Sequence, residues 1–275
     1  MKIWIHIGPG KSGSTWLYNM ACSNGHIFSL PTIKETQTFH HHAEIDLGFY
    51  KQDSSSSHKI LCDFSNTYIF NPVSLSNIQS FVRNSPDHEV LLTSLLRCPL
   101  KRSLSHYKYL SASGLIPGRH TLEDLLEEEP SFLLRSRYDL FMPYISSLNM
   151  NVNYFTLHSQ GTGSSPAILK FILNACGVPL DSLNNSKQDT FSGFSARNRF
   201  LSLLAKQVSY VMRDRNPATL SVLKNSSIVR SIIMKKDVTH QPVCSDLTLG
   251  IMRSFLEPTK SYCHNIGLDV SDWLL

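Results

Sequence analysis

The sequence predicts an α/β fold of three layers, with a central parallel sheet, helices on both faces, and a phosphate-binding loop after the first strand. Two observations support this prediction. Apolar, β-branched segments alternate with segments of helical pattern, and strands that alternate with helices form parallel sheets covered on both faces. The first such strand also runs directly into a glycine-rich loop, which aims backbone N–H groups at an anion when a helix follows.

The element order follows from these patterns. Strands are expected at 2–7, 90–96 and 152–157, where β-branched and apolar residues are concentrated. Helices are expected to follow each strand, at 16–20, from Pro99 onwards and at 166–175. Further helices are expected from Thr121, which can cap a helix that Pro130 stops, and at 137–148, 199–213 and 252–266, with a polar loop at 184–198.

The length of 275 residues allows one large domain or two small ones, and the composition is that of a globular protein. No internal repeat or long linker divides the chain, so we expect a single domain over residues 1–275. Hydrophobic residues make up 41% and charged residues 17% of the chain, and the mean hydropathy is -0.12, which excludes a coiled coil, a collagen-like repeat and a disordered chain. The net charge of +5 is too small to indicate a nucleic-acid partner, but it suits a small anionic ligand.

The distribution of cysteine and apolar residues bears on the compartment. The 6 cysteines are far apart and form no C-x-x-C pair, so neither a zinc site nor a disulfide framework is expected. No apolar run approaches the roughly 20 residues that cross a bilayer, and the stretch from Ile3 to Ile7 is too short for a signal peptide. We therefore expect a soluble, cytoplasmic protein with no membrane partner. The sequence leaves open whether the protein is a monomer or a homodimer.

The glycine loop after the first strand departs from the usual nucleotide P-loop. Gly8 and Gly13 fit the frame G-x-x-x-x-G-K-[ST], but Ser14 stands where that motif has its lysine. The lysine of this loop is Lys11, between the two glycines. That placement argues against an ATPase or kinase.

A second candidate phosphate site begins where the strand at 90–96 ends. Arg97 follows that strand and Ser105 lies on the expected helix after it. A guanidinium and a hydroxyl near the start of a helix can hold a phosphate. Two separate phosphate sites suggest a nucleotide that is phosphorylated at both ends.

These two segments resemble those of the sulfotransferases that use 3′-phosphoadenosine 5′-phosphosulfate (PAPS). The run from Lys11 to Trp16 is similar to that family's phosphosulfate loop, and Arg97-x-Pro99-x-x-Arg102-x-x-Ser105-x-Tyr107 is similar to its 3′-phosphate motif. The C-terminal Leu268-x-x-Ser271-x-Trp273 also resembles relatives. The resemblance implies that Trp16 stacks on adenine and that Arg97 and Ser105 bind the 3′-phosphate, while the 5′-phosphosulfate is held by Gly10, Lys11, Ser12, Gly13, Ser14 and Thr15. Arg102 is either a ligand contact or a surface charge on its helix.

A third segment, from Lys34 to Phe39, resembles the Lys-Glu-x-His-[Phe/Tyr]-Phe stretch of the heparan-type and bacterial branches. In those branches the glutamate is the general base, which implies that role for Glu35. Gln37 replaces the histidine of that stretch. His40 is the second candidate for the base and Asp63 the third, and no metal is expected, because neighbouring loop histidines such as His40 to His42 are usually solvated.

Together these observations predict a sulfotransferase that moves a sulfuryl group from PAPS to a hydroxyl or amine of a small-molecule acceptor and releases PAP. Lys11 would stabilise the charge on the departing phosphate, and the resemblance implies that Ser105 bonds Lys11 until substrate arrives. Tyr68, Tyr138 and the loop at 184–198 are expected to line the acceptor pocket. Lys235 and Lys236 are either a substitute for the family's third cofactor loop or solvent lysines that close a helix. The alternatives are a P-loop kinase of a small metabolite and a non-catalytic nucleotide-binding module.

Overall fold

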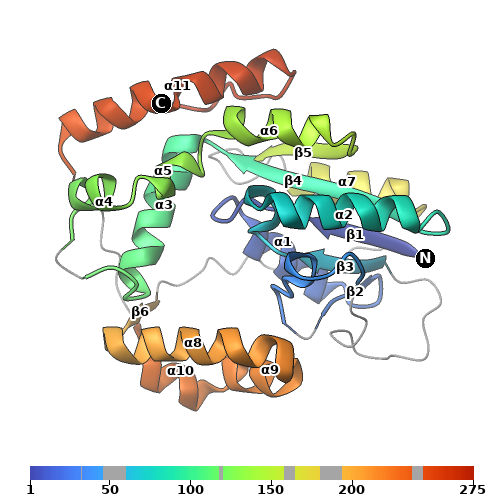
Figure 1. Ribbon diagram of the computed structural model, residues 1–275, viewed down its shortest axis with the longest axis horizontal. Coiled ribbons are helices and arrows are strands. Elements are labelled where there is room, and N and C mark those ends of the chain that lie inside the picture. Colours follow the sequence, from blue (N-terminus) through green and yellow to red (C-terminus); the bar gives the residue numbers. More distant parts are fainter. Residues whose placement is uncertain (32, 46–59, 118–119, 158–164, 180–193, 237–243) are drawn as a thin grey trace. The chain divides into compact units, whose positions relative to one another are not determined.

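The computed structural model describes residues 1–31, 33–45, 60–117, 120–157, 165–179, 194–236 and 244–275. The chain divides into two compact units. The first unit comprises residues 1–99, 137–187 and 258–274, and the second comprises residues 100–136, 188–257 and 275. Figure 1 labels the elements of both units.

The first unit is built on a parallel sheet with the strand order β2-β3-β1-β4-β5. Its strands are β1 (Lys2–His6), β2 (Phe28–Ser29), β3 (Ile60–Phe64), β4 (Glu89–Arg97) and β5 (Val152–Leu157). In the middle of the sheet, Ile5 of β1 lies opposite Asp63 of β3 and Leu92 of β4. The predicted central parallel sheet is confirmed, and so are the strands expected at 2–7, 90–96 and 152–157; β2 and β3 were not among the expected strands.

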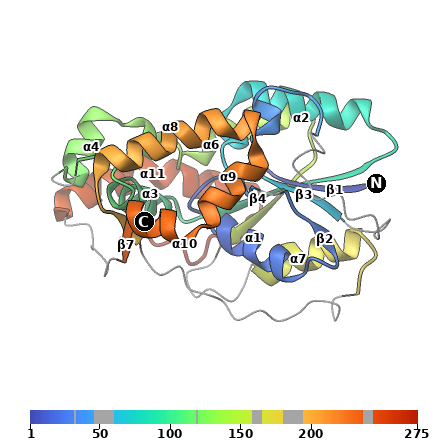
Figure 2. The ribbon, with the colours of Figure 1, turned by 90° about the horizontal axis from the view of Figure 1, so that it is seen from below.

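Helices cover both faces of this sheet. Ile3, Ile5 and Ile7 pack in a cluster with α2 (Pro72–Asn84) and α6 (Tyr138–Ser147), whereas Trp4 packs with α1 (Ser14–Ser23) and α7 (Ser165–Ala175). Figure 2 shows α2 on one side of the sheet and α1 and α7 on the other. Because successive side chains of a strand point to opposite faces, a strand that is apolar on both sides must be covered on both. The predicted three-layer architecture is therefore confirmed.

The second unit is mainly helical. Its helices are α3 (Pro99–Ala112), α4 (Leu122–Glu128), α5 (Ser131–Leu134), α8 (Arg199–Arg215), α9 (Pro217–Asn225) and α10 (Ser227–Ile233). The first residue of α3, Pro99, is counted with the first unit. The strands β6 (Phe194–Ala196) and β7 (Met234–Lys236) pair antiparallel, and α11 (Asp246–Asn265) begins here and ends in the first unit. Thr121 caps α4 as expected, in a reciprocal capping box with Asp124.

Two expectations are corrected in this unit. The segment expected to be a loop at 184–198 contains the strand β6, which pairs with β7. Strands pair through backbone N–H and C=O groups, so the polar side chains of this segment do not prevent the pairing. Residues 184–193 lie outside the described residues. Lys235 and Lys236 lie on β7 and so do not close a helix. Among the residues that the structure describes, no helix is both long and apolar enough to cross a membrane.

Candidate active site

The candidate site lies at the carboxyl edge of the parallel sheet. The glycine loop follows β1, Asn66 follows β3 and Arg97 ends β4. β1 lies between β3 and β4, with parallel pairing on both sides, so the carboxyl ends of these three strands share one edge. The strand order reverses about β1, and open α/β sheets bind their ligands outside the carboxyl ends at such a point.

The backbone of the glycine loop adopts left-handed conformations at several positions. The φ angles are 104° at Gly8, 68° at Lys11 and 94° at Gly13. A Cβ at Gly8 would collide with the backbone carbonyl of Asn66, so this position requires glycine for space as well as for conformation. Gly13 is the N-cap of α1, and no side chain caps the helix there. Uncapped N–H groups at a helix N-terminus form an anion site together with a turn of this kind.

Ser12 supplies an independent sign of a ligand. Its side chain is fully buried, and its hydroxyl has no hydrogen-bond partner among the residues that the structure describes. A buried hydroxyl without a partner costs free energy, of the order of 1–3 kcal/mol. A phosphate or sulfate oxygen bound in the loop would satisfy this group, so the residues present fit an anionic ligand.

Lys34 brings a second ammonium to the start of α1. Its Nζ donates to the Thr15 hydroxyl at 2.9 Å and to the Ser14 hydroxyl at 3.4 Å. Burial lowers the pKa of Lys34, and the nearby Glu35 carboxylate opposes that shift. Sequence reasoning gave Lys34 no role of its own, because no spacing in the sequence places it beside residues 14 and 15.

Arg97 lies against the backbone of the same loop. Its Nη1 donates to the carbonyl oxygen of Lys11 at 3.2 Å, and the hydroxyl of Tyr138 donates to its carbonyl at 2.7 Å. Burial lowers the pKa of Arg97. Lys11 is half-buried in the loop. Ser105 is half-buried on α3 in the second unit, whereas Arg97 and Lys11 belong to the first.

Glu35 is joined to this arrangement through its carboxylate. Asn66 Nδ2 donates to Glu35 Oε1 at 2.5 Å, and the same oxygen lies 3.9 Å from Lys34 Nζ. The side chain is half-buried. The fold thus links Glu35, by way of Lys34, to the hydroxyl of Thr15, so the predicted base and the predicted phosphosulfate loop lie together.

Asp63 lies behind this arrangement and is fully buried. Its Oδ2 accepts from Thr36 at 3.0 Å and from Tyr68 at 2.9 Å, and its Oδ1 accepts from Ser65 at 3.0 Å. Burial raises the pKa of Asp63 to about 6, against these hydrogen bonds, which lower it. Both carboxylate oxygens are engaged, so Asp63 is a positioning group in this structure.

The hydroxyl groups around Asp63 hold the segment that follows Glu35. Ser65 Oγ accepts from the backbone N–H of Gln37 at 3.0 Å, and the hydroxyl of Tyr68 accepts from that of Phe39 at 3.3 Å. These contacts fix the chain between Glu35 and the short 3-10 helix η1 (Thr38–His40). The Asp63 network therefore anchors the segment that carries the candidate base.

His40, the second candidate base, is tied to the start of α2. Its Nε2 lies 2.8 Å from the Thr67 hydroxyl, and its Nδ1 lies 2.7 Å from Asn71 Nδ2 and 2.8 Å from the Ser74 hydroxyl. Both ring nitrogens are engaged, which argues for a structural role.

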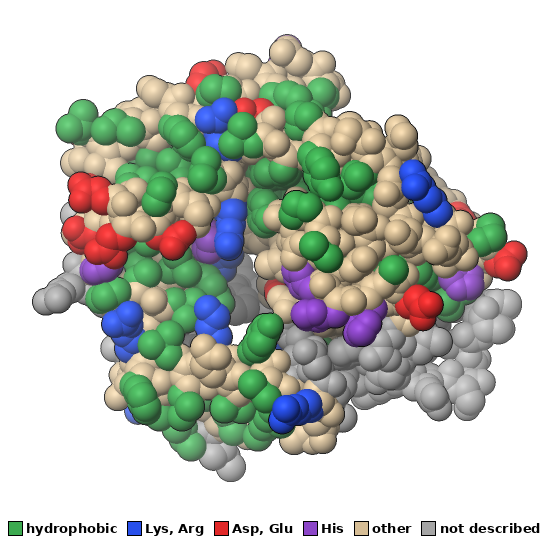
Figure 3. Space-filling model, in the orientation of Figure 1, with side chains coloured by type: hydrophobic (Ala, Val, Ile, Leu, Met, Phe, Trp, Pro, Cys, Tyr) green, Lys and Arg blue, Asp and Glu red, His purple; other side chains and the backbone are tan. Residues whose placement is uncertain are grey.

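The remaining histidines of that run are exposed. His41 and His42 are accessible to solvent, and Figure 3 shows histidine side chains, in purple, gathered on one surface. Within the described ranges no group of three His, Cys, Asp or Glu side chains is placed to hold a metal ion.

Other predicted residues lie in the core. Tyr68 and Tyr138 are fully buried, so the expectation that they line an acceptor pocket is wrong; their hydroxyls bond inside the fold. Arg102 is also buried, with Nε donating to Ser136 at 2.9 Å, so it is not a surface charge. Trp16 is half-buried and packs against the core cluster between the sheet and α1 and α7.

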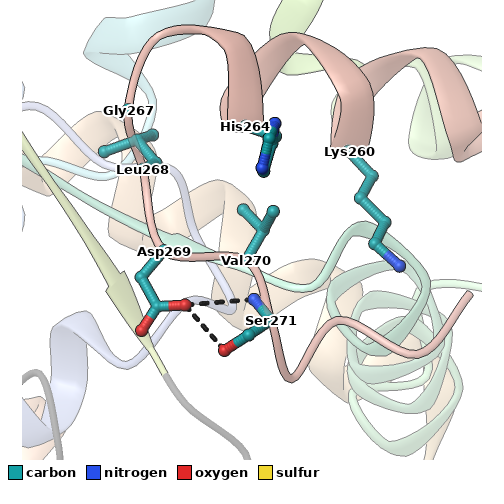
Figure 4. Close-up of a pocket in the computed structure, with 7 residues that line it drawn as sticks. All are labelled: Lys260, His264, Gly267, Leu268, Asp269, Val270 and Ser271. Carbon is teal, nitrogen blue, oxygen red and sulfur yellow. Dashed lines mark hydrogen bonds between the residues drawn. The ribbon is translucent and has the colours of Figure 1, made fainter.

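A separate pocket of about 510 Å³ lies at the C-terminal end of α11, within the first unit. Figure 4 shows Lys260, His264 and Ser271 among the residues that line it. Asp269 Oδ1 accepts from the backbone N–H and the hydroxyl of Ser271, at 3.1 and 2.7 Å. The pocket includes Leu268 and Ser271 of the predicted C-terminal motif, and its lining contains no residue of the glycine loop.

No family model matches the chain, and no curated protein matches it either. Among solved structures, the chain is similar to the crystal structure of a sulfotransferase from Alicyclobacillus acidocaldarius, with a TM-score of 0.50 and 14% sequence identity. The match covers 86% of this chain and 97% of that one. The chain therefore has a sulfotransferase-like α/β fold.

Proposed function

We propose that this protein is a sulfotransferase that transfers a sulfuryl group from PAPS to a hydroxyl or amine of a small-molecule acceptor. The observation that supports this most is the convergence of Lys34 and Arg97 on the loop of Lys11, at the N-terminus of α1. Glu35 lies next to these cations. The fold supports the same proposal, because the solved structure that this chain resembles is that of a sulfotransferase.

The residues at the glycine loop have the chemistry that PAPS requires. We assign the 5′-phosphosulfate to the loop from Gly10 to Thr15, where the Ser12 hydroxyl lacks a partner among the described residues. Lys34 adds a second positive charge. Trp16 is assigned to the adenine and Arg97 to the 3′-phosphate. When bound, PAPS supplies an activated sulfuryl group on a good leaving group.

The proposed chemistry uses Glu35 as general base. Its carboxylate accepts the proton of the acceptor hydroxyl or amine as the new S–O or S–N bond forms. The Asn66 amide holds one carboxylate oxygen and so orients the group. The S–O bond to the 5′-phosphate breaks in the same step, and the ammonium of Lys11 stabilises the charge that develops on that oxygen.

The reaction is proposed to need no metal ion. The transferred sulfuryl group carries less charge than a phosphoryl group, and Lys11, Lys34 and Arg97 supply positive charge at the loop. The P-loop kinase alternative is less favoured, because Ser14 occupies the place of the motif lysine.

The test is transfer of label from sulfur-labelled PAPS to a panel of phenols, alcohols and amines in the presence of EDTA. The proposal expects a labelled product and free PAP from at least one acceptor, with the rate unchanged by the chelator. Loss of turnover in EDTA that Mg²⁺ restores, with transfer from ATP instead, would indicate the kinase. Binding of PAP without transfer to any acceptor would indicate the non-catalytic module.

A further inference from the structure

One helix of the second unit presents its apolar stripe to solvent. In α8, Phe200, Leu204, Val208 and Val211 recur at intervals of four, four and three residues and are 71%, 50%, 44% and 50% exposed. This spacing places them on one face of the helix. Ser202, on the opposite side of α8, is only 8% exposed. A helix at the surface of a globular protein normally buries the apolar face and exposes the polar one, so α8 is oriented the other way round.

The stripe has apolar neighbours that widen it. Leu203 and Tyr210 are also exposed, and they lie between the stripe and the basic side chains of Arg199 and Lys206 along the helix surface. On the adjoining helix, Val222 of α9 is 70% exposed. Exposed apolar side chains are therefore present on both helices, and on α8 they form a stripe instead of scattered single residues, which would need no explanation.

The charge of this part of the chain is strongly one-sided. Residues 197–236 contain nine Lys or Arg and a single Asp, a net charge of +8, so the rest of the chain, at +5 overall, carries -3. Arg197, Arg199, Lys206, Arg215 and Lys224 are exposed. Where α8 lies in Figure 1, Figure 3 shows green apolar and blue basic side chains on the described residues and no red ones.

We propose that α8 docks on an anionic lipid surface, in contrast to the expectation from the sequence that the protein has no membrane partner. A helix with an apolar face flanked by Lys and Arg lies in the plane of a bilayer interface, with the apolar side chains among the acyl chains and the cations at the headgroups. This inference is independent of the proposed sulfuryl transfer.

The combination of charge and apolar surface selects this partner over two others. A second copy of the chain would bring together two segments, residues 197–236 of each copy, that each carry a net charge of +8, and like-charge repulsion opposes this. A polyanion such as nucleic acid or heparin would engage the basic side chains but leave the stripe of Phe200, Leu204, Val208 and Val211 in water. An anionic bilayer satisfies both features at once.

The test is co-sedimentation of the full-length protein with vesicles of phosphatidylcholine alone or of phosphatidylcholine with phosphatidylserine. We expect binding to the anionic vesicles that falls as salt is raised. The variant F200S/L204S/V208S should bind at least about tenfold more weakly, because interfacial affinity scales with the apolar area inserted. The variant R199Q/K206Q should lose about fivefold for each charge removed.

The matched control is V73S/L140S/L247S, which removes exposed apolar side chains of α2, α6 and α11. It should bind like the parent protein, and circular dichroism should show that every variant is folded. Equal binding to neutral and anionic vesicles, no binding by the parent protein, or unchanged binding by the α8 variants would overturn the proposal. So would a dimer in sedimentation that F200S/L204S/V208S abolishes, or heparin binding without vesicle binding.

Discussion

Lys34 and Thr15 are 19 residues apart in the chain, and Lys34 Nζ donates a hydrogen bond of 2.9 Å to Thr15 Oγ1. The bond places an ammonium at the N-terminus of α1, where backbone N–H groups already favour an anion. The same ammonium lies 3.9 Å from the carboxylate of Glu35. One lysine thus connects the candidate phosphosulfate site to the candidate base.

Replacing Lys34 with Gln should weaken the binding of PAP by about 10- to 100-fold. A hydrogen bond to a charged group is worth about 1.5–3 kcal/mol, and the substitution removes the charge at the loop. Calorimetric titration with PAP measures the effect. Lys170→Gln, at an exposed position of α7, is the matched control and should bind like the parent protein. An unchanged affinity for Lys34→Gln would show that this ammonium does not face the ligand.

Replacing Glu35 with Gln should lower the rate of the chemical step by about 10²–10⁴-fold, because the amide keeps the shape but cannot accept the proton. PAP affinity should change much less than with Lys11→Ala, which removes a group proposed to touch the ligand. Single-turnover kinetics with an alcohol acceptor is the measurement, since a neutral amine could mask the loss. Glu44→Gln, at an exposed carboxylate of the same region, is the control; near-parent turnover of Glu35→Gln would place the base elsewhere.

Replacing Gly8 with Ala should destabilise the fold more than replacing Gly177 with Ala. Both glycines have a left-handed φ, 104° and 65°, so both substitutions carry backbone strain of about 1–2 kcal/mol. Only at Gly8 would the new Cβ also collide with the carbonyl of Asn66, whereas nothing lies within 4 Å at Gly177. Urea unfolding of both variants measures the difference, and equal losses would contradict the close approach of the loop to Asn66.

Replacing Asp63 with Asn should change how stability depends on pH. The pKa of Asp63 is about 6 in the folded protein, against an ordinary value of 3.8 for an aspartate. Between these values the folded state binds more protons than the unfolded state, so this group makes the free energy of unfolding fall as pH rises through that window. The full effect is on the order of 3 kcal/mol.

The unfolding free energy of Asp63→Asn, taken relative to the parent protein, should therefore increase from about pH 4 to about pH 7. Comparing the two proteins at each pH cancels the contributions of other titrating groups. Asp87→Asn, which removes an exposed carboxylate, is the matched control. Parallel profiles for Asp63→Asn and the parent protein would mean that Asp63 is already ionised when folded in this range.

The sequence predicts the centre of the fold better than its edges. β1 contains the apolar run from Ile3 to Ile5, and a short apolar run before a glycine loop has few other structures available. β3 was missed because Asp63 interrupts its apolar run, and the hydroxyls that satisfy this buried carboxylate, on Thr36, Ser65 and Tyr68, come together only in the fold. α2 was missed although Asn71 caps it and Pro72 occupies its first position, which is a recognised start pattern.

The candidate site was likewise predictable only in part. Lys11 and Glu35 could be proposed because each stands in a short local motif. The bonds from Lys34 to Thr15 and from Asn66 to Glu35 join residues that are 19 and 31 positions apart in the chain, and no local pattern encodes such contacts. The assignment of Tyr68 and Tyr138 to a pocket was wrong, because the sequence around a tyrosine does not show whether its hydroxyl is buried or exposed.

The measurement that tests the central claim most directly is calorimetric titration of the protein with PAP and with ADP, for the parent protein and for Arg97→Ala. If the loop and Arg97 form a site for a nucleotide phosphorylated at both ends, PAP should bind at least about tenfold more tightly than ADP, and Arg97→Ala should remove most of that preference. Equal affinities for the two nucleotides, or tighter binding of ADP that depends on Mg²⁺, would contradict the assignment to PAPS-dependent sulfuryl transfer.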